Sequence, residues 1–171
     1  MFRKKNDNDP WHKLPIGPEY LNVNCFGVNG ENIYAGTESG IIISNDNGNS
    51  WNECNNGLVD LDVKTIYLNG SDILAGFHLG KSDGGLYKSS DLGKSWSYFS
   101  LNEFNIYSIV SHNNILLVGN DLALFASSDN GKTWVCLKEG CVNMLFKTDE
   151  YLFGCFDFEN LWKIKLSDII I

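Results

Sequence analysis

The stretch SSDLGKSW at residues 89–96 is the strongest indication of the fold, because two more versions of it occur elsewhere in the chain. They are SNDNGNSW at residues 44–51 and SSDNGKTW at residues 127–134. We call each copy a box. A pattern that returns at a period of about forty residues is typical of a repeat architecture. The shared pattern is Ser-x-Asp-x-Gly-x-Ser/Thr-Trp, formed by Ser44, Asp46, Gly48, Ser50 and Trp51, by Ser89, Asp91, Gly93, Ser95 and Trp96, and by Ser127, Asp129, Gly131, Thr133 and Trp134.

The box has the chemistry of a tight turn between two strands. Its Asp carboxylate can accept hydrogen bonds from backbone N–H groups of the turn, and its Gly takes a positive φ at little cost. The Ser or Thr hydroxyl can bond locally, while the Trp supplies a large apolar anchor where the next strand begins. We therefore predict that each box is a structural turn.

Short apolar runs surround the boxes. Those that end in Gly are residues 33–36, 73–76 and 116–119, and a fourth, 151–154, has no box after it. Runs of about four to six residues between polar turns are typical of strands, and no segment keeps a helical period. The recurring order of strands and box predicts an all-β chain, built as a β-propeller of four-stranded antiparallel blades.

The fourth unit lacks its last strand, and a stretch near the N-terminus has the spacing of such a strand. Trp11 precedes Gly17 by six residues, just as Trp51 precedes Gly57. We therefore predict that residues 11–14 form a strand that pairs with the C-terminal unit and closes a ring of four blades. Closure would remove two exposed sheet edges. The alternatives are half of a larger ring, completed by a homodimer with eight blades, and a fragment of a longer chain.

The predicted propeller forms a single domain over residues 11–171. Residues 1–10 are then a flexible basic and polar tail, or a decayed box with Asn6 at the Asp position and Asn8 at the Gly position.

The three boxes resemble the Asp-box, or BNR repeat, of sialidases, sortilin-type receptors, xyloglucan-degrading glycosidases and photosystem assembly factors. In those families the box joins the third and fourth strands of a propeller blade and lies away from the catalytic or binding face. The resemblance therefore implies a propeller and says little about its ligand.

Composition narrows the classes of partner. A net charge of −8 argues against nucleic acid and against an anionic membrane surface. The first residues carry no signal-peptide core, so the compartment is unknown with a leaning towards the cytoplasm. Five cysteines without a C-x-x-C spacing predict free, buried thiols.

Enzymatic chemistry finds little support in the residues. The sialidase resemblance implies three arginines on the substrate carboxylate, and the chain contains only Arg3. A glycosidase would need two carboxylates across a cleft, and half of one propeller offers no such cleft. The three histidines are scattered and show no zinc spacing. We expect no enzyme activity, no catalytic residues, no cofactor and no metal, although glycoside hydrolysis is not fully excluded.

The loops opposite the boxes carry the remaining prediction. The loop at residues 77–85 is longer than its counterparts, and long loops on rigid scaffolds often bind ligands. The neighbouring loops are rich in acids, which favours a basic protein or peptide over an anionic ligand. We predict a non-enzymatic binding or scaffold module that is a monomer or a homodimer. One alternative is a glycan-binding or degenerate glycosidase-like propeller, although carbohydrate is the less expected ligand. The other is a structural unit of a larger ring. The expected binding residues are Glu38, His78, Lys81, Asp83, Asp121, Asp157 and Glu159.

Overall fold

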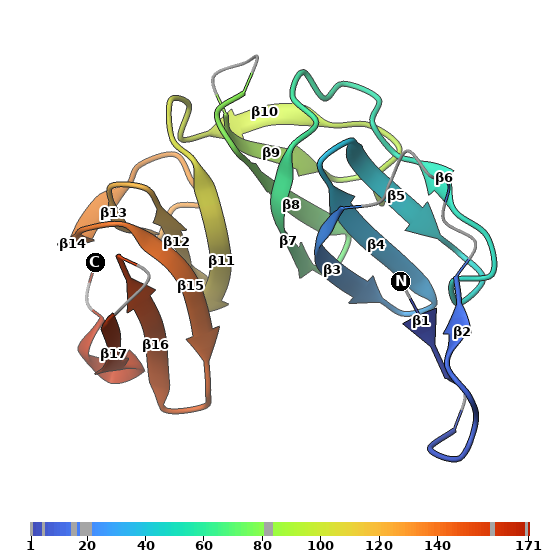
Figure 1. Cartoon of the computed structure of the whole chain (residues 1–171). Coiled ribbons are helices and arrows are strands. Elements are labelled where there is room, and N and C mark those ends of the chain that lie inside the picture. Colours follow the sequence, from blue (N-terminus) through green and yellow to red (C-terminus); the bar gives the residue numbers. More distant parts are fainter. Residues whose placement is uncertain are drawn as a thin grey trace.

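The computed structural model describes residues 2–4, 6–14, 17, 22–80, 84–157, 160–169 and 171. Its strands form four antiparallel sheets and one small hairpin (Figure 1). This confirms the predicted all-β propeller with four blades. Blade 1 consists of β3 (Val23–Asn29), β4 (Asn32–Thr37), β5 (Gly40–Ser44) and β6 (Asn52–Glu53). Blade 2 consists of β7 (Val63–Asn69), β8 (Asp72–Phe77), β9 (Gly85–Ser89) and β10 (Ser97–Ser100). Blade 3 consists of β11 (Ile106–His112), β12 (Ile115–Asn120), β13 (Ala123–Ser127) and β14 (Val135–Glu139), and blade 4 of β15 (Val142–Lys147), β16 (Tyr151–Phe156) and β17 (Asn160–Lys165).

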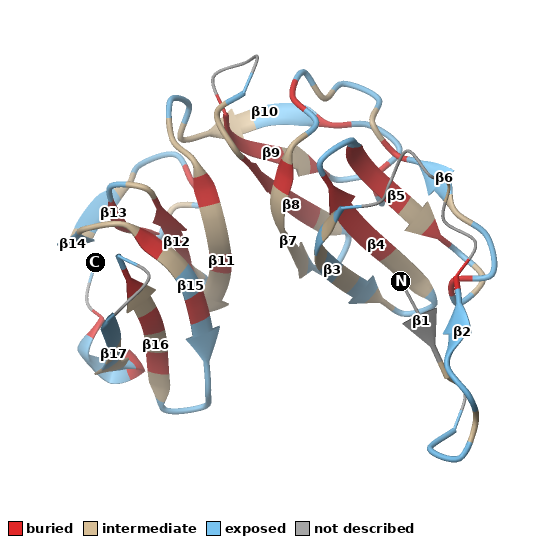
Figure 2. Cartoon of the chain, in the orientation of Figure 1, coloured by how far each residue is buried: buried red, intermediate tan, exposed pale blue. Residues whose placement is uncertain are grey.

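Burial explains the apolar runs of the sequence. The second strands of blades 1, 2 and 3 are covered on both faces, so β4, β8 and β12 are almost continuously buried, whereas β16 of blade 4 alternates (Figure 2). The outer strands β6 and β14 are mostly exposed. A strand covered on both faces needs consecutive apolar residues, whereas one that is covered on one side alternates.

Apolar cores join each blade to the next. One core lies between blades 1 and 2, a second between blades 2 and 3, and a third between blades 3 and 4. The inner strands accordingly contact one another in the order β3, β7, β11, β15. No described core joins blade 4 to blade 1, and the four blades form an arc that is open at the bottom of Figure 1.

The N-terminal strand does not close this arc. β2 (His12–Lys13) pairs with β1 (Phe2–Arg3), and both lie beside blade 1, so the predicted pairing of residues 11–14 with the C-terminal unit is wrong within this chain (Figure 1). The physical reason is the open arc, which separates the N-terminal segment from β17. The prediction of a strand at this place is confirmed by β2.

The fourth unit also departs in register from the repeat seen in the sequence. Cys155 pairs with Met144 beside the bulge of β15, in the place where Gly36 pairs with Cys25 in blade 1. Gly154 is therefore one residue out of step with Gly36. Trp162 covers Gly154 from the neighbouring strand, and a Cβ there would collide with the indole.

The three boxes share one hydrogen-bond pattern. In the first, Ser44 donates to Asp46 Oδ1 at 2.8 Å, and the Ser50 N–H and hydroxyl donate to the two Asp46 oxygens at 2.8 and 2.7 Å. The second and third boxes repeat these bonds. The bonds from the box hydroxyl and N–H lower the pKa of each Asp from 3.8 to about 2.

The backbone of the box turns left-handed at two successive residues. Gly48, Gly93 and Gly131 have φ of 81°, 85° and 77°, as the turn chemistry predicted. The Trp anchor differs between copies. Trp96 is buried and its Nε1 donates to the Cys54 carbonyl at 2.7 Å, whereas Trp51 and Trp134 are half-buried.

At Asn6 the bonding differs from that of a box. Its side chain donates to the Asp9 carboxylate at 3.2 Å instead of accepting bonds from the turn.

Candidate binding face

The face opposite the boxes is built from two kinds of loop. One joins the second and third strands of each blade, and the other leads from one blade into the next. Because all sheets are antiparallel, both loops emerge at the end of the blade away from the box. We call this surface the loop face. The inner strands β3, β7, β11 and β15 begin on it.

A repeated pair of residues marks this face in every blade. The first member directly precedes the inner strand, the second directly follows the next strand, and the two are sixteen residues apart. The four pairs are Asn22 with Glu38, Asp62 with His78, Asn105 with Asp121, and Cys141 with Asp157.

A backbone bond holds the members of most pairs together. The N–H of the second residue donates to the carbonyl of the first in blades 1, 2 and 4, at 3.2, 3.0 and 2.9 Å. Side chains add to this. Asn22 Nδ2 donates to Glu38 Oε2 at 2.7 Å, and the Cys141 N–H donates to Asp157 Oδ1 at 3.2 Å. Each pair thus holds one carboxylate on the loop face of its blade.

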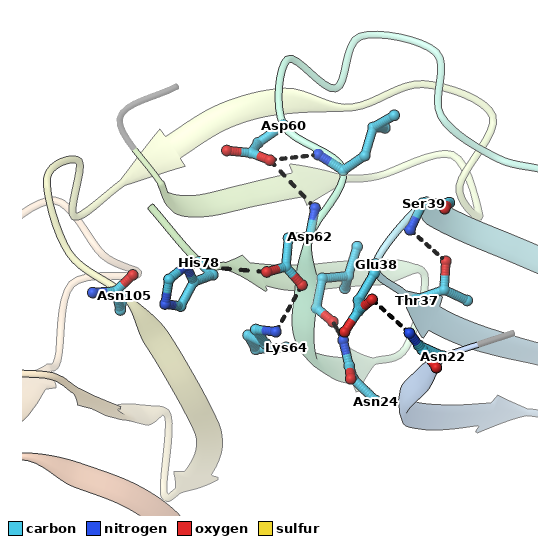
Figure 3. Close-up of polar contacts among 12 residues, drawn as sticks. Asn22, Asn24, Thr37, Glu38, Ser39, Asp60, Asp62, Lys64, His78 and Asn105 are labelled. Atoms are coloured by element: carbon cyan, nitrogen blue, oxygen red, sulfur yellow. Dashed lines mark hydrogen bonds and ion pairs between the residues drawn. The ribbon is translucent and has the colours of Figure 1, made fainter. Parts of the chain in front are cut away.

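In the blade 2 pair, a lysine and a histidine lie on either side of the carboxylate. Lys64 Nζ lies 2.7 Å from Asp62 Oδ1, and His78 Nδ1 lies 4.0 Å from Asp62 Oδ2 (Figure 3). Nearby, the buried Asp60 accepts the N–H groups of Leu61 and Asp62 at 2.7 and 3.3 Å. Asp60 therefore shapes the loop that presents Asp62.

Hydrogen bonds connect the pairs of blades 2 and 3. Asn105 Oδ1 accepts the Leu79 N–H at 2.6 Å, beside His78 in Figure 3. The same side chain donates through Nδ2 to Asp121 Oδ2 at 2.9 Å, and its N–H donates to Asp121 Oδ1 at 3.1 Å. Asp121 thus accepts two bonds from one residue, so its carboxylate has a fixed orientation.

The structure places four of the predicted site residues in these pairs: Glu38, His78, Asp121 and Asp157. Glu38 and Asp157 are exposed, while His78 and Asp121 are partly covered. Lys81, Asp83 and Glu159, which the sequence also suggested, lie outside the described residues.

The expected binding residues did not include the other pair members, above all Asp62 and the residues Asn22 and Asn105 that orient the acids. The sixteen-residue spacing was present in the sequence and would have found them. It was hidden because the first member differs in residue type from blade to blade, and only the hydrogen bonds show that the positions are equivalent.

Other features of the described residues lie elsewhere or point to no further chemistry. A hollow lined by Asn55, Asn56 and Lys94 lies between the outer strand of blade 1 and the second box, away from the four pairs. Among the residues that the structure describes, no three His, Cys, Asp or Glu side chains form a group that could hold a metal ion. Within the same residues, no helix has the length and apolar character needed to cross a membrane.

Known proteins resemble this chain in structure and not in sequence. No family model matches it, and no curated protein sequence does. The extracellular domain of the putative hybrid two-component system BT4673 from B. thetaiotaomicron superposes with a TM-score of 0.74 at 13% identity, covering 94% of this chain and 23% of that one. An ancestral GH74 enzyme gives 0.66 at 18% identity, over 94% and 26%.

A third structure, YCF48 bound to D1 peptide, gives a TM-score of 0.63 at 15% identity, over 95% of this chain and 60% of that one. At these identities the likeness shows the propeller fold alone. This chain spans about a quarter of the BT4673 and GH74 structures.

Proposed function

We propose that this propeller is a non-enzymatic binding module whose loop face holds a basic segment of a protein or peptide. The observation that carries the proposal is the recurring pair, which sets one carboxylate on the loop face of each of four successive blades. It belongs to the second member of the pair in blades 1, 3 and 4, and to the first member in blade 2. These carboxylates belong to Glu38, Asp62, Asp121 and Asp157.

Charge on the loop face favours a cationic ligand. The two ion pairs described there both involve Asp62, with Lys64 and with His78. Glu38, Asp121 and Asp157 instead accept hydrogen bonds from uncharged groups. The donor to Glu38 is a side-chain amide, and the donors to Asp121 and Asp157 include backbone N–H groups. Their negative charge is therefore oriented but not neutralised by these partners, which attracts lysine and arginine side chains.

The likeness to YCF48 bound to D1 peptide supports a peptide as the ligand. The acids follow one another along the arc, one on each blade. An extended peptide could therefore meet successive carboxylates with alternate side chains, because these point the same way in an extended chain.

Peptide binding can be tested with a labelled lysine- and arginine-rich peptide in fluorescence anisotropy. The triple variant Glu38→Gln, Asp121→Asn, Asp157→Asn should weaken binding at least about tenfold, and salt should weaken wild-type binding. The control carries the same charge change on the box side of the molecule, at the exposed residues Glu31, Asp149 and Glu150.

Equal weakening by both triple variants would mean that only net charge matters, and the proposed face would be wrong. No binding of any basic peptide by wild-type protein would also contradict the proposal. Circular dichroism must show that the loop-face variant is folded, because Asp121 accepts two hydrogen bonds from Asn105.

A glycan-binding or glycosidase-like role is the second candidate, and the likeness to a GH74 enzyme supports it. An oligosaccharide array separates the two ideas. Hydrolysis of any glycan that is lost in Asp121→Asn would overturn the non-enzyme proposal.

We also propose that the chain belongs with the Asp-box repeat propellers. The support is the identical bonding of Ser, Asp and the second hydroxyl in all three boxes. Transplanting one box into a blade of such a propeller, with stability kept, would test this.

A further inference from the structure

We infer that two copies of this chain assemble head to tail into a closed ring of eight blades, in which β2 of each copy completes blade 4 of the other. The inference concerns the open ends of the arc and is independent of the peptide-binding proposal. It rests on three observations: an unfilled sheet edge, a strand that stands in the place of a missing blade, and two unmatched apolar faces.

The unfilled edge belongs to blade 4. Its sheet has the order β15-β16-β17, while blades 1, 2 and 3 each add a fourth strand beyond the third. In blade 1 that fourth strand pairs Asn52 with Ile43 and Glu53 with Ile42. On β17 no described strand occupies the corresponding edge, which exposes backbone groups that can pair.

The N-terminal segment stands where a preceding blade would put its fourth strand. For the first two boxes, the residue three after the Trp packs on the Gly of the next box: Cys54 Sγ lies 2.5 Å from where a Gly93 Cβ would be, and Phe99 Cε1 lies 2.5 Å from that of Gly131. Leu14, three residues after Trp11, packs in the same way on Gly48, with Cδ2 at 3.5 Å.

β2 is therefore a fourth strand by position. It is docked on blade 1, but the first three strands of its own blade are not beside it.

Exposed apolar residues mark the two ends of the arc. On the blade 1 side, Phe26 and Val28 are 50% and 64% exposed. Their counterparts Ile66 and Leu68 in β7, at the same register, pack into the core between blades 1 and 2. This side of blade 1 thus has the residues of a blade-to-blade contact and no described blade against it.

The other end of the arc shows the complementary face. On β15, Met144 and Phe146 are each 62% exposed. Phe146 pairs with Phe153 as Val110 pairs with Leu117, and Val110 packs into the core between blades 3 and 4. The ends of the arc are therefore the two halves of the contact that already occurs three times within the chain.

A second copy of the chain can cover the exposed apolar faces at both ends of the arc at once. A contact from the last blade of one copy to the first blade of another is head to tail, and it closes on itself when the arc spans half a ring. The resulting dimer has eight blades, within the usual range of propellers. Closure leaves no unpaired edge on blade 4, which removes a site of aggregation.

The register of the exchanged strand follows from the other blades. Trp162 on β17 pairs with Gly154 as Ile42 pairs with Ala35. Since Ile42 faces Glu53 and Ile43 faces Asn52, Lys13 of one copy should face Trp162 of the other, and His12 should face Lys163.

Cross-linking between two single variants tests this register. One protein carries His12→Cys and the other Lys163→Cys, both with the exposed Cys136 changed to Ser. Directly opposed Cα atoms lie about 4.5–5.5 Å apart, within reach of a disulfide. Mild oxidation of the mixture should give a covalent heterodimer, and a mismatched mixture of His12→Cys with Lys165→Cys should give much less.

The double variant His12→Cys, Lys163→Cys separates exchange from closure within one chain. Exchange gives covalent dimers, whereas a disulfide inside a monomer would show a closed four-blade ring and overturn the inference. The absence of a disulfide in both experiments would overturn it as well.

Light scattering supplies an independent readout. The wild-type protein should have about twice the 19.2 kDa mass of the chain. Phe146→Glu should raise the dissociation constant of the dimer at least about tenfold, because it places a charge in the apolar contact. Leu122→Glu is the matched control, since Leu122 is 61% exposed and lies on the loop face. A monomeric wild-type protein, or equal effects of the two variants, would refute the assembly.

Discussion

The box tryptophan of blade 2 offers the sharpest test of how this propeller is held together. Trp96 is 5% exposed and belongs to the core between blades 1 and 2, and its Nε1 donates to the Cys54 carbonyl at 2.7 Å. Truncating a buried Trp to Ala costs about 3–5 kcal/mol. Leaving a buried carbonyl without its donor costs about 1–3 kcal/mol more. We therefore expect Trp96→Ala to lower the free energy of unfolding by about 5 kcal/mol.

A loss of this size approaches the whole stability of many domains, which is about 5–15 kcal/mol. Trp96→Phe is thus the informative companion, because it keeps an aromatic ring and removes the N–H. It should cost about 1–3 kcal/mol. Trp51→Phe is its matched control: the indole N–H of Trp51 is buried but has no partner among the described residues. The control should therefore lose less than about 1 kcal/mol.

Urea unfolding followed by far-UV circular dichroism gives these energies by linear extrapolation. A loss below about 1 kcal/mol for Trp96→Ala would refute the view that the box anchors neighbouring blades. Equal losses for the two Phe variants would refute the role of the Trp96 hydrogen bond.

Three further predictions concern the thiols, acid stability and one loop glycine. Burial raises the pKa of Cys25 and Cys54 to about 11, so maleimide should label the exposed Cys136 first, and mass spectrometry that finds equal labelling would contradict this. The pKa of each box aspartate is lowered from 3.8 to about 2, so the ionised carboxylates stabilise the fold above pH 3.8. This contribution should vanish as the pH falls towards 2, and a constant urea midpoint over that range would count against it. Gly57 has φ of 91° and lies against the Trp96 carbonyl, so Gly57→Ala should cost about 1–3 kcal/mol, and an unchanged melting curve would be the contrary result.

Local signals predicted the blades well, because their causes are local. The box turn depends on residues within eight positions, and the buried strands depend on runs of five to seven residues. The prediction failed in detail at blade 4, where Cys155 stands in the place of Gly36 and no box follows to mark the register. Free thiols were predicted and are found, but of the five only Cys54 is buried; Cys136 is exposed and the other three are half-buried.

The candidate site was half visible in the sequence. Acidic loops in the sequence pointed to the loop face, and Glu38, His78, Asp121 and Asp157 lie on it. The partners that orient the acids were not found, because a hydrogen bond such as that from Asn105 to Asp121 depends on how two strand ends meet.

By itself the sequence determined the repeat, the turn of each box and the all-β blades, since each follows from the residue types in a short window. It also marked Trp11 to Leu14 as a displaced fourth strand. Only the tertiary structure decided where that strand lies. Leu14 packs on the first box, while at the other end of an open arc no described strand lies on the outer edge of β17. The reason is that the angle between successive blades comes from the shapes of whole inter-blade cores. That angle is a sum over many long-range contacts, and no single stretch of residues encodes it.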